Sequence, residues 1–130
     1  MKPLILVPLS DDEPLLLYIA ATTQVVSAAL VVEREEEGHS LKVQRPVYFV
    51  SEVLSDFKTR YSQILKLLYA ILITKRKLRH YFGSHPVTVV TSFPLGEVIH
   101  SQDATGRTVT WALELMDQGI TYATQTAIKS

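Results

Sequence analysis

Several classes of catalytic site are excluded because the residue types or spacings that they require are absent from this sequence. The 130 residues contain no cysteine, which excludes thiol catalysis, disulfides and cysteine-ligated zinc. No G-x-S-x-G nucleophile elbow and no glycine-rich phosphate loop occurs. The histidines, His39, His80, His85 and His100, lack the i, i+4 spacing that places two imidazoles on one helix face. We therefore interpret them as surface or capping residues and predict no metal site from them.

Carboxylates are the oxygen ligands that a two-metal nuclease requires at strand ends and on a neighbouring helix. In this sequence the acidic run 11–13 precedes the first expected strand, and the run 33–37 lies in an expected exposed connection. The expected strand interiors and the middle of the expected helix contain no acids. Asp103, Glu114 and Asp117 lie further along the chain and would form a site only if the fold brought them together.

Basic side chains cluster in the segment "KRKLRHYF", which contains Lys75, Arg76, Lys77 and Arg79. Basic residues interleaved with aromatic residues are typical of surfaces that contact phosphates and stack bases. The same pattern is typical of a helix end, where the macrodipole favours cations. Thirteen basic residues balance thirteen acidic ones, so no net field attracts a polyanion. Nucleic-acid binding by this cluster therefore stays an alternative.

The uncharged stretch 14–32 is nearly as long as a membrane-spanning helix, so two interpretations, a membrane helix and a β-hairpin, must be compared. Thr22, Thr23 and Gln24 interrupt its middle, and its flanks lack an aromatic belt with basic anchors. This favours two strands joined by a turn. The N-terminal run is broken by Pro3 and Pro8 and lacks a cleavage site, so we expect a cytoplasmic or nuclear protein that is neither secreted nor membrane-bound.

Hydrophobic periodicity predicts the remaining elements of a mixed α/β domain. A third strand is expected over 45–54, with Val47 and Phe49 on one face and Tyr48 and Val50 on the other. A long helix is expected over 55–82, capped by Ser55 or Asp56 and closed by Gly83. The following elements are expected to be a strand buried on both faces at 85–92, a turn or short helix at 93–100, a helix at 103–119 and a strand at 120–128.

Several segments in this order, among them "LYIAAT", "RYSQILKL" and "VTSFPL", resemble the ribonuclease H-like domain that follows the reverse transcriptase in gypsy-class retrotransposons, particularly the plant branch. The resemblance covers 14–130 and leaves 1–13 as an N-terminal extension. It implies a mixed five-stranded sheet with a long central helix and one or two shorter helices. In the family this domain removes the RNA strand of an RNA/DNA hybrid with acidic residues and Mg²⁺.

The resemblance also implies that the family's ligand acids are replaced here. Its first-strand aspartate corresponds to Ala20, its helix glutamate to Leu65 and its aspartate after the fourth strand to Ser92, and the fourth acid would lie beyond Ser130. Without these oxygen ligands the chain has no hold on Mg²⁺, so we expect no cofactor and a catalytically inactive domain. An active hybrid nuclease with relocated acids is the alternative.

The wider fold implies a C-terminal helix over the sheet face opposite the long helix, and the sequence ends before it. An uncovered apolar face usually finds a partner. We expect either the N-terminal residues 1–9 or a second copy of the chain to cover it. The leading hypothesis is therefore a pseudoenzyme that acts as a protein-interaction or binding module, as a homo-oligomer or with another protein.

Overall fold

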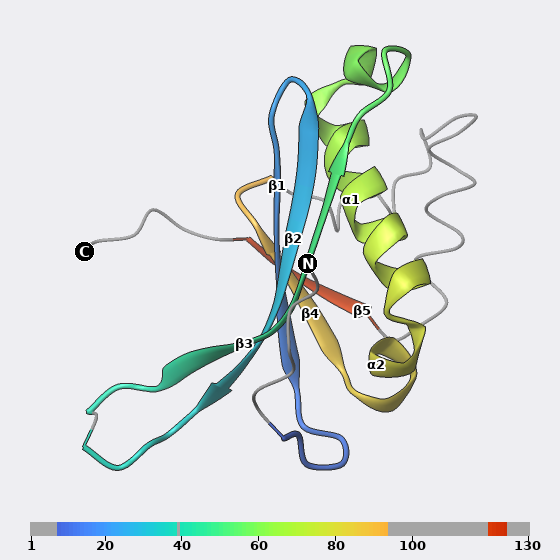
Figure 1. Ribbon diagram of the computed structural model, residues 1–130. Helices are drawn as coiled ribbons and strands as arrows, with labels where there is room; N and C mark the ends of the chain where they lie inside the picture. Colours follow the sequence, from blue (N-terminus) through green and yellow to red (C-terminus); the bar gives the residue numbers. More distant parts are fainter. Residues whose placement is uncertain (1–7, 39, 94–119, 125–130) are drawn as a thin grey trace.

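The computed structural model describes residues 8–38, 40–93 and 120–124, which form a five-stranded sheet with helices on one side (Figure 1). The strands are β1 (Leu15–Ala21), β2 (Val25–Arg34), β3 (Val43–Val53), β4 (Val87–Thr91) and β5 (Ile120–Thr124). The helices are the 3-10 turn η1 (Lys58–Arg60), α1 (Gln63–Lys77) and α2 (Arg79–Ser84). The turn or helix expected at 93–100, the helix expected at 103–119 and the last residues of the final strand lie almost wholly outside the described residues.

The strand order is β3-β2-β1-β4-β5. Neighbours β1, β2 and β3 pair antiparallel, whereas β4 pairs parallel with both β1 and β5. The long connection through α1 is what a parallel β4 needs, because parallel strands cannot be joined by a tight turn. The prediction of a mixed five-stranded sheet is confirmed.

The uncharged stretch that opens the domain is a hairpin, as predicted. Its strands β1 and β2 pair from Leu15↔Val32 to Ala21↔Val26. In the turn, Thr22 Oγ1 accepts hydrogen bonds from the backbone N–H of Gln24 at 3.3 Å and of Val25 at 3.0 Å. Within the described residues, no helix has the length and apolar character needed to cross a membrane.

Strand β3 contains an irregularity that the sequence pattern did not reveal. The pairing with β2 slips between Leu30↔Tyr48 and Val31↔Pro46, which leaves Val47 as an extra residue on β3. Val47 is consequently 2% exposed on the α1 side, whereas Phe49 is 56% exposed on the other side. The prediction that these two residues share a face is therefore wrong. The slip occurs at Pro46, which has no N–H to donate to the sheet.

The helical segment starts later and ends differently than predicted. Ser62 is the N-cap of α1, and Ser55 lies seven positions earlier, where its hydroxyl accepts a hydrogen bond from Lys58 N in the 3-10 turn. The helix breaks at Leu78, and α2 then continues through Gly83 to Ser84. The predicted caps at Ser55 or Asp56 and the closure at Gly83 are therefore wrong. Pro86, which follows the last helical turn after one residue, ends the segment instead.

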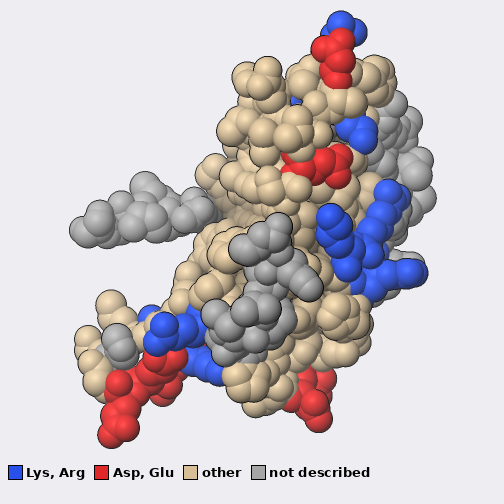
Figure 2. Space-filling view, viewed as in Figure 1, with Lys and Arg blue, Asp and Glu red and all other residues tan. Residues whose placement is uncertain are grey.

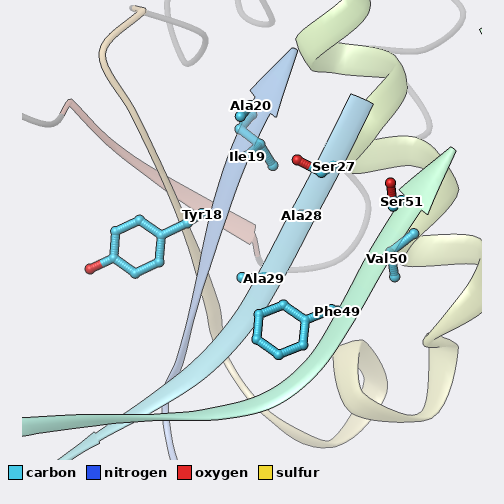
Figure 3. Close-up of a pocket in the computed structure, with 9 residues that line it drawn as sticks. All are labelled: Tyr18, Ile19, Ala20, Ser27, Ala28, Ala29, Phe49, Val50 and Ser51. Carbon is cyan, nitrogen blue, oxygen red and sulfur yellow. The ribbon is translucent and has the colours of Figure 1, made fainter. Parts of the chain in front are cut away.

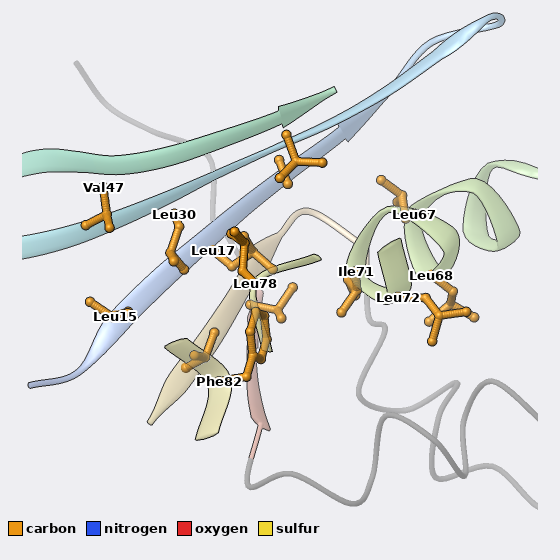
Figure 4. Close-up of a cluster of buried hydrophobic side chains, with 14 of the residues drawn as sticks. Leu15, Leu17, Leu30, Val47, Leu67, Leu68, Ile71, Leu72, Leu78 and Phe82 are labelled. Atoms are coloured by element: carbon orange, nitrogen blue, oxygen red, sulfur yellow. The ribbon is translucent and has the colours of Figure 1, made fainter. Parts of the chain in front are cut away.

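The main core lies between α1 and the sheet (Figure 4). Leu17, Leu30, Leu68, Ile71 and Val89 are all at most 1% exposed. In β4 only the alternate residues Val87, Val89 and Thr91 are buried, so the prediction of burial on both faces is wrong. The α1 side buries one set, whereas the described part of the chain places no helix on the other side (Figure 1). The connection between β2 and β3 is also shorter than expected, because Glu33 belongs to β2.

Candidate functional site

Strand β1 and strand β4 bring two of the predicted site residues into one cleft. The parallel register pairs Tyr18 with Val90, so Ala20 and Ser92, each two residues further on, reach the same edge of the sheet. Both residues line a cleft of about 220 Å³ together with Gln63 and Leu67 of α1. Thr91 and Phe93 complete its β4 side. This is the point at which β1, α1 and β4 converge.

Leu65, the third predicted position, does not line this cleft. It is the third residue of α1, and its backbone N–H donates to Ser62 Oγ at 3.2 Å. The α1 residue that lies in the cleft is Leu67, which is 2% exposed. The sequence gives no capping-box signal for this arrangement, because leucine stands at the position where the Ser-x-x-Glu pattern requires a glutamate.

Polar side chains of α1 fasten the end of the first hairpin beside the cleft. Gln63 Nε2 donates to the carbonyl oxygen of Ala21 at 3.3 Å. Lys66 Nζ donates to the carbonyl oxygens of Thr22 and Thr23, both at 3.1 Å, although the residue is only 6% exposed. Carbonyl oxygens at a strand end thus receive donors from α1, so these groups serve to hold the elements together.

The residues of the cleft do not fit a hard divalent cation. Its lining offers methyl and isobutyl groups, two hydroxyls and one amide, whereas Mg²⁺ in proteins is held by carboxylates. Among residues 8–38, 40–93 and 120–124, no three histidines or acids gather closely enough to hold a metal ion.

Glu13, the last residue of the acidic run before β1, is engaged in an ion pair away from the cleft. Glu13 forms a two-pronged ion pair with Arg34, with both N–O distances at 2.9 Å. The hydrogen bonds from Arg34 and then from Ser10 N lower the pKa of Glu13 to about 2. This pair fixes the segment before β1 to the end of β2. The relocated acids considered from the sequence, Asp103, Glu114 and Asp117, lie outside the described residues.

Glu52 contradicts the expectation that the strand interiors contain no acid. It lies in β3 and accepts a hydrogen bond from the phenol of Tyr69 on α1. Lys58 Nζ donates to Tyr69 Oη at 2.7 Å and lies 3.9 Å from Glu52 Oε2. The pKa of Lys58 is raised by the Tyr69 bond, and burial raises the pKa of Tyr69. The contacts among these three side chains connect β3, η1 and α1. None of the three residues lines the cleft.

The predicted basic cluster lies at the C-terminal end of the helical segment. Lys75, Arg76 and Lys77 form the last turn of α1, and Arg79 begins α2. Figure 2 shows Lys and Arg gathered over this end of α1. Lys75 is only 9% exposed, whereas the other three side chains are exposed.

Two of the four histidines, His80 and His85, are described. His85 Nδ1 lies 2.9 Å from the carbonyl oxygen of Glu13.

The sheet face opposite α1 carries an apolar groove of about 400 Å³ (Figure 3). Two rows of paired residues cross it: Tyr18–Ala29–Phe49 and Ala20–Ser27–Ser51. Figure 3 shows the rings of Tyr18 and Phe49 on either side of Ala29. Gln44 Nε2 donates to the Tyr18 hydroxyl at 2.7 Å, which holds one of the two rings. Sequence reasoning expected an apolar face here and missed its aromatic walls.

The strand order, the parallel pairing of β4 and the helix on one face define a ribonuclease H-like fold. The chain belongs to the family described as the RNase H-like domain found in reverse transcriptase, whose model matches residues 10–118. No curated protein matches the chain.

Part of the solved structures of foamy viral protease-reverse transcriptase has a similar fold. The form described as dRH, in complex with double-stranded DNA, has a TM-score of 0.66 and 16% identity over 92% of this chain and 21% of that chain. The complex with an RNA/DNA hybrid has a TM-score of 0.65 and 17% identity over 91% of this chain and 16% of that chain. The chain therefore spans about a fifth of the length of these proteins.

Proposed function

We propose that this chain is a catalytically inactive, retrotransposon-derived RNase H-like domain of the gypsy class, plant branch, that acts as a binding module. In the proposal it self-associates or binds another protein in the cytoplasm or nucleus, and it uses no cofactor. The observation that carries the proposal is the side-chain content of the cleft, where Ala20, Leu67 and Ser92 meet. The family resemblance places the carboxylates that hold Mg²⁺ at Ala20, Leu65 and Ser92, where this chain has a methyl, an isobutyl and a hydroxyl group.

The physical reason is the energetics of metal-assisted phosphodiester cleavage. Divalent metal ions contribute several kcal/mol of charge stabilisation in the transition state, and hard cations are held by oxygen ligands. The hydroxyls of Thr91 and Ser92 and the amide of Gln63 do not replace three carboxylates. Leu67 fills the core beneath them. Burying an apolar side chain there stabilises the fold at the expense of the ligand set.

Cleavage of a labelled RNA/DNA hybrid in Mg²⁺ and in Mn²⁺ tests the proposal directly. We expect no cleavage above the metal-free background by the wild-type chain. The triple variant Ala20→Asp/Leu67→Glu/Ser92→Asp is expected to bind Mn²⁺ in calorimetry, and a matched triple variant with Leu65→Glu in place of Leu67→Glu is expected to bind it at least about tenfold more weakly. Metal-dependent cleavage by the wild-type chain that is lost in Glu114→Gln or Asp117→Asn would establish the relocated-acid alternative instead.

A second candidate function, non-catalytic nucleic-acid binding, is favoured by the exposed cations at the end of α1. Foamy viral reverse transcriptases with the same fold are seen in complex with double-stranded DNA and with an RNA/DNA hybrid. Binding through Lys75, Arg76, Lys77 and Arg79 predicts a steep fall of affinity with salt, because each neutralised phosphate releases counterions. Fluorescence anisotropy measures the affinity for an RNA/DNA hybrid of the wild type and of the variant Arg76→Gln/Lys77→Gln/Arg79→Gln. An unchanged affinity in the variant excludes this surface as the binding site for nucleic acid.

A further inference from the structure

The face of the sheet opposite α1 contains a slot shaped for one aromatic ring. Tyr18, Ala29 and Phe49 are direct neighbours on β1, β2 and β3. Strands lie about 4.8 Å apart, so the two ring-bearing positions are separated by roughly 10 Å with only the methyl group of Ala29 between them. The next row, Ala20, Ser27 and Ser51, continues the low floor with small side chains.

The chain itself presents a ring that suits such a slot. Phe49 is 56% exposed, and the neighbouring Val53 on the same face of β3 is 74% exposed. Phe49 therefore forms one wall of the slot and also a protruding apolar knob beside it. A surface that carries a knob next to a matching hollow is self-complementary, which is the property that a two-fold symmetric interface requires.

The absence of charged side chains in the groove favours an uncharged partner. The groove residues include no charged side chain, so two copies of this face meet without like-charge repulsion. A nucleic-acid backbone gains nothing here, because the exposed cations of the α1 end lie on the helix side of the sheet (Figures 1 and 2). An uncharged apolar partner is what this face fits.

We infer that a second copy of this chain docks on the face opposite α1, with Phe49 of each copy inserted over Ala29 of the other, between Tyr18 and Phe49. This names the partner surface of the binding module proposed above and rests on that proposed function only for its self-association. Catalytic inactivity is a separate matter, tested by hybrid cleavage.

The size of the face sets the strength of the dimer. Five strands about 4.8 Å apart and about six residues long give a projected area of roughly 500 Å². Stable interfaces bury about 800 Å² on each partner. A dimer built on this face alone is thus weak, and its population depends on the protein concentration. Offset or edge-to-face packing of the aromatic rings adds to the apolar contact.

Light scattering coupled to size-exclusion chromatography, from low micromolar to near-millimolar concentration, tests the inference. The wild type is expected to rise from 14.6 kDa toward twice that mass. Phe49→Glu is expected to raise the dimer dissociation constant at least about tenfold. The matched control is Leu41→Glu, because Leu41 is 80% exposed in the β2–β3 connection and is expected to leave the constant unchanged. Circular dichroism of each variant verifies folding.

Cross-linking gives a second, independent readout. The natural chain has no cysteine, so a single introduced thiol can link only to another copy. We expect Ser51→Cys to be captured as a dimer by a short bis-maleimide far more than Leu41→Cys at the same concentration. A wild-type monomer throughout the concentration range, or a dimer unaffected by Phe49→Glu, overturns the inference, and neither result bears on catalysis.

Discussion

Ser62 Oγ accepts a hydrogen bond from the backbone N–H of Leu65 at 3.2 Å, which makes Leu65 the third residue of a side-chain-capped helix. In a complete capping box a glutamate at this position reaches back to the N–H of the cap residue. The position that the family resemblance assigned to a metal ligand is therefore placed to stabilise the helix start. Leu67, one half-turn further on, occupies the cleft beside Ala20 and Ser92.

Changing Leu65 to Glu is thus expected to keep or raise stability. The new carboxylate can complete the capping box and interacts favourably with the N-terminal dipole, which together are worth about 0.5–1 kcal/mol in the free energy of unfolding. The loss of partial apolar packing by Leu65 offsets part of this gain. Urea unfolding measures it. The matched variant Leu67→Glu, at a position 2% exposed, is expected to lose about 3 kcal/mol or more. Equal losses for both would refute this assignment of the two positions.

The ion pair of Glu13 with Arg34 predicts a dependence of stability on acid pH. The pKa of Glu13 is about 2 in the folded chain, below its ordinary value of 4.5. A lowered pKa means that the folded state favours the ionised form, so this stabilisation is complete above about pH 4.5 and disappears as the pH falls toward 2. Glu13→Gln is expected to flatten the curve of unfolding midpoint against pH in this window. A mutant curve parallel to that of the wild type would contradict the pairing.

Lys66 connects α1 to the first hairpin, and its removal tests that connection. Lys66→Met keeps most of the apolar stem but removes the hydrogen bonds to the carbonyl oxygens of Thr22 and Thr23. We expect a loss of about 1–3 kcal/mol in the free energy of unfolding, because bonds from a charged donor at a largely buried site are lost. Lys77→Met, at an exposed position of the same helix, is the control and is expected to change little. Denaturant unfolding midpoints compare the two.

The sequence predicted what depends on period and composition, and missed what depends on contacts between distant segments. The first hairpin followed from the polar triplet at 22–24, and the mixed sheet followed from the order of elements. The slip at Pro46 that turns Val47 inward depends on pairing with Leu30 and Val31, which no local pattern reports. Glu52 is an acid within a strand. Its carboxylate has partners there, because Tyr69 approaches it from α1 and Lys58 from η1.

The candidate site shows the same division. Ala20 and Ser92 reach one edge of the sheet because β1 and β4 pair in parallel, a long-range contact that no local motif reports. Which α1 residue reaches the cleft depends on how the helix packs against the sheet, and Leu67 is identified only by that packing.

Tyr122 on β5 is partly buried, and its hydroxyl group is buried and finds no partner in the described part of the structure. Burial raises its pKa far above the ordinary value. An unpaired buried hydroxyl costs about 1–3 kcal/mol, so Tyr122→Phe is expected to leave stability unchanged or to raise it by about 1 kcal/mol. The control is Tyr69→Phe, which removes hydrogen bonds to Lys58 and Glu52 and is expected to lower stability. Thermal unfolding of both variants decides the matter, because a destabilised Tyr122→Phe would mean that its hydroxyl is satisfied in the folded chain.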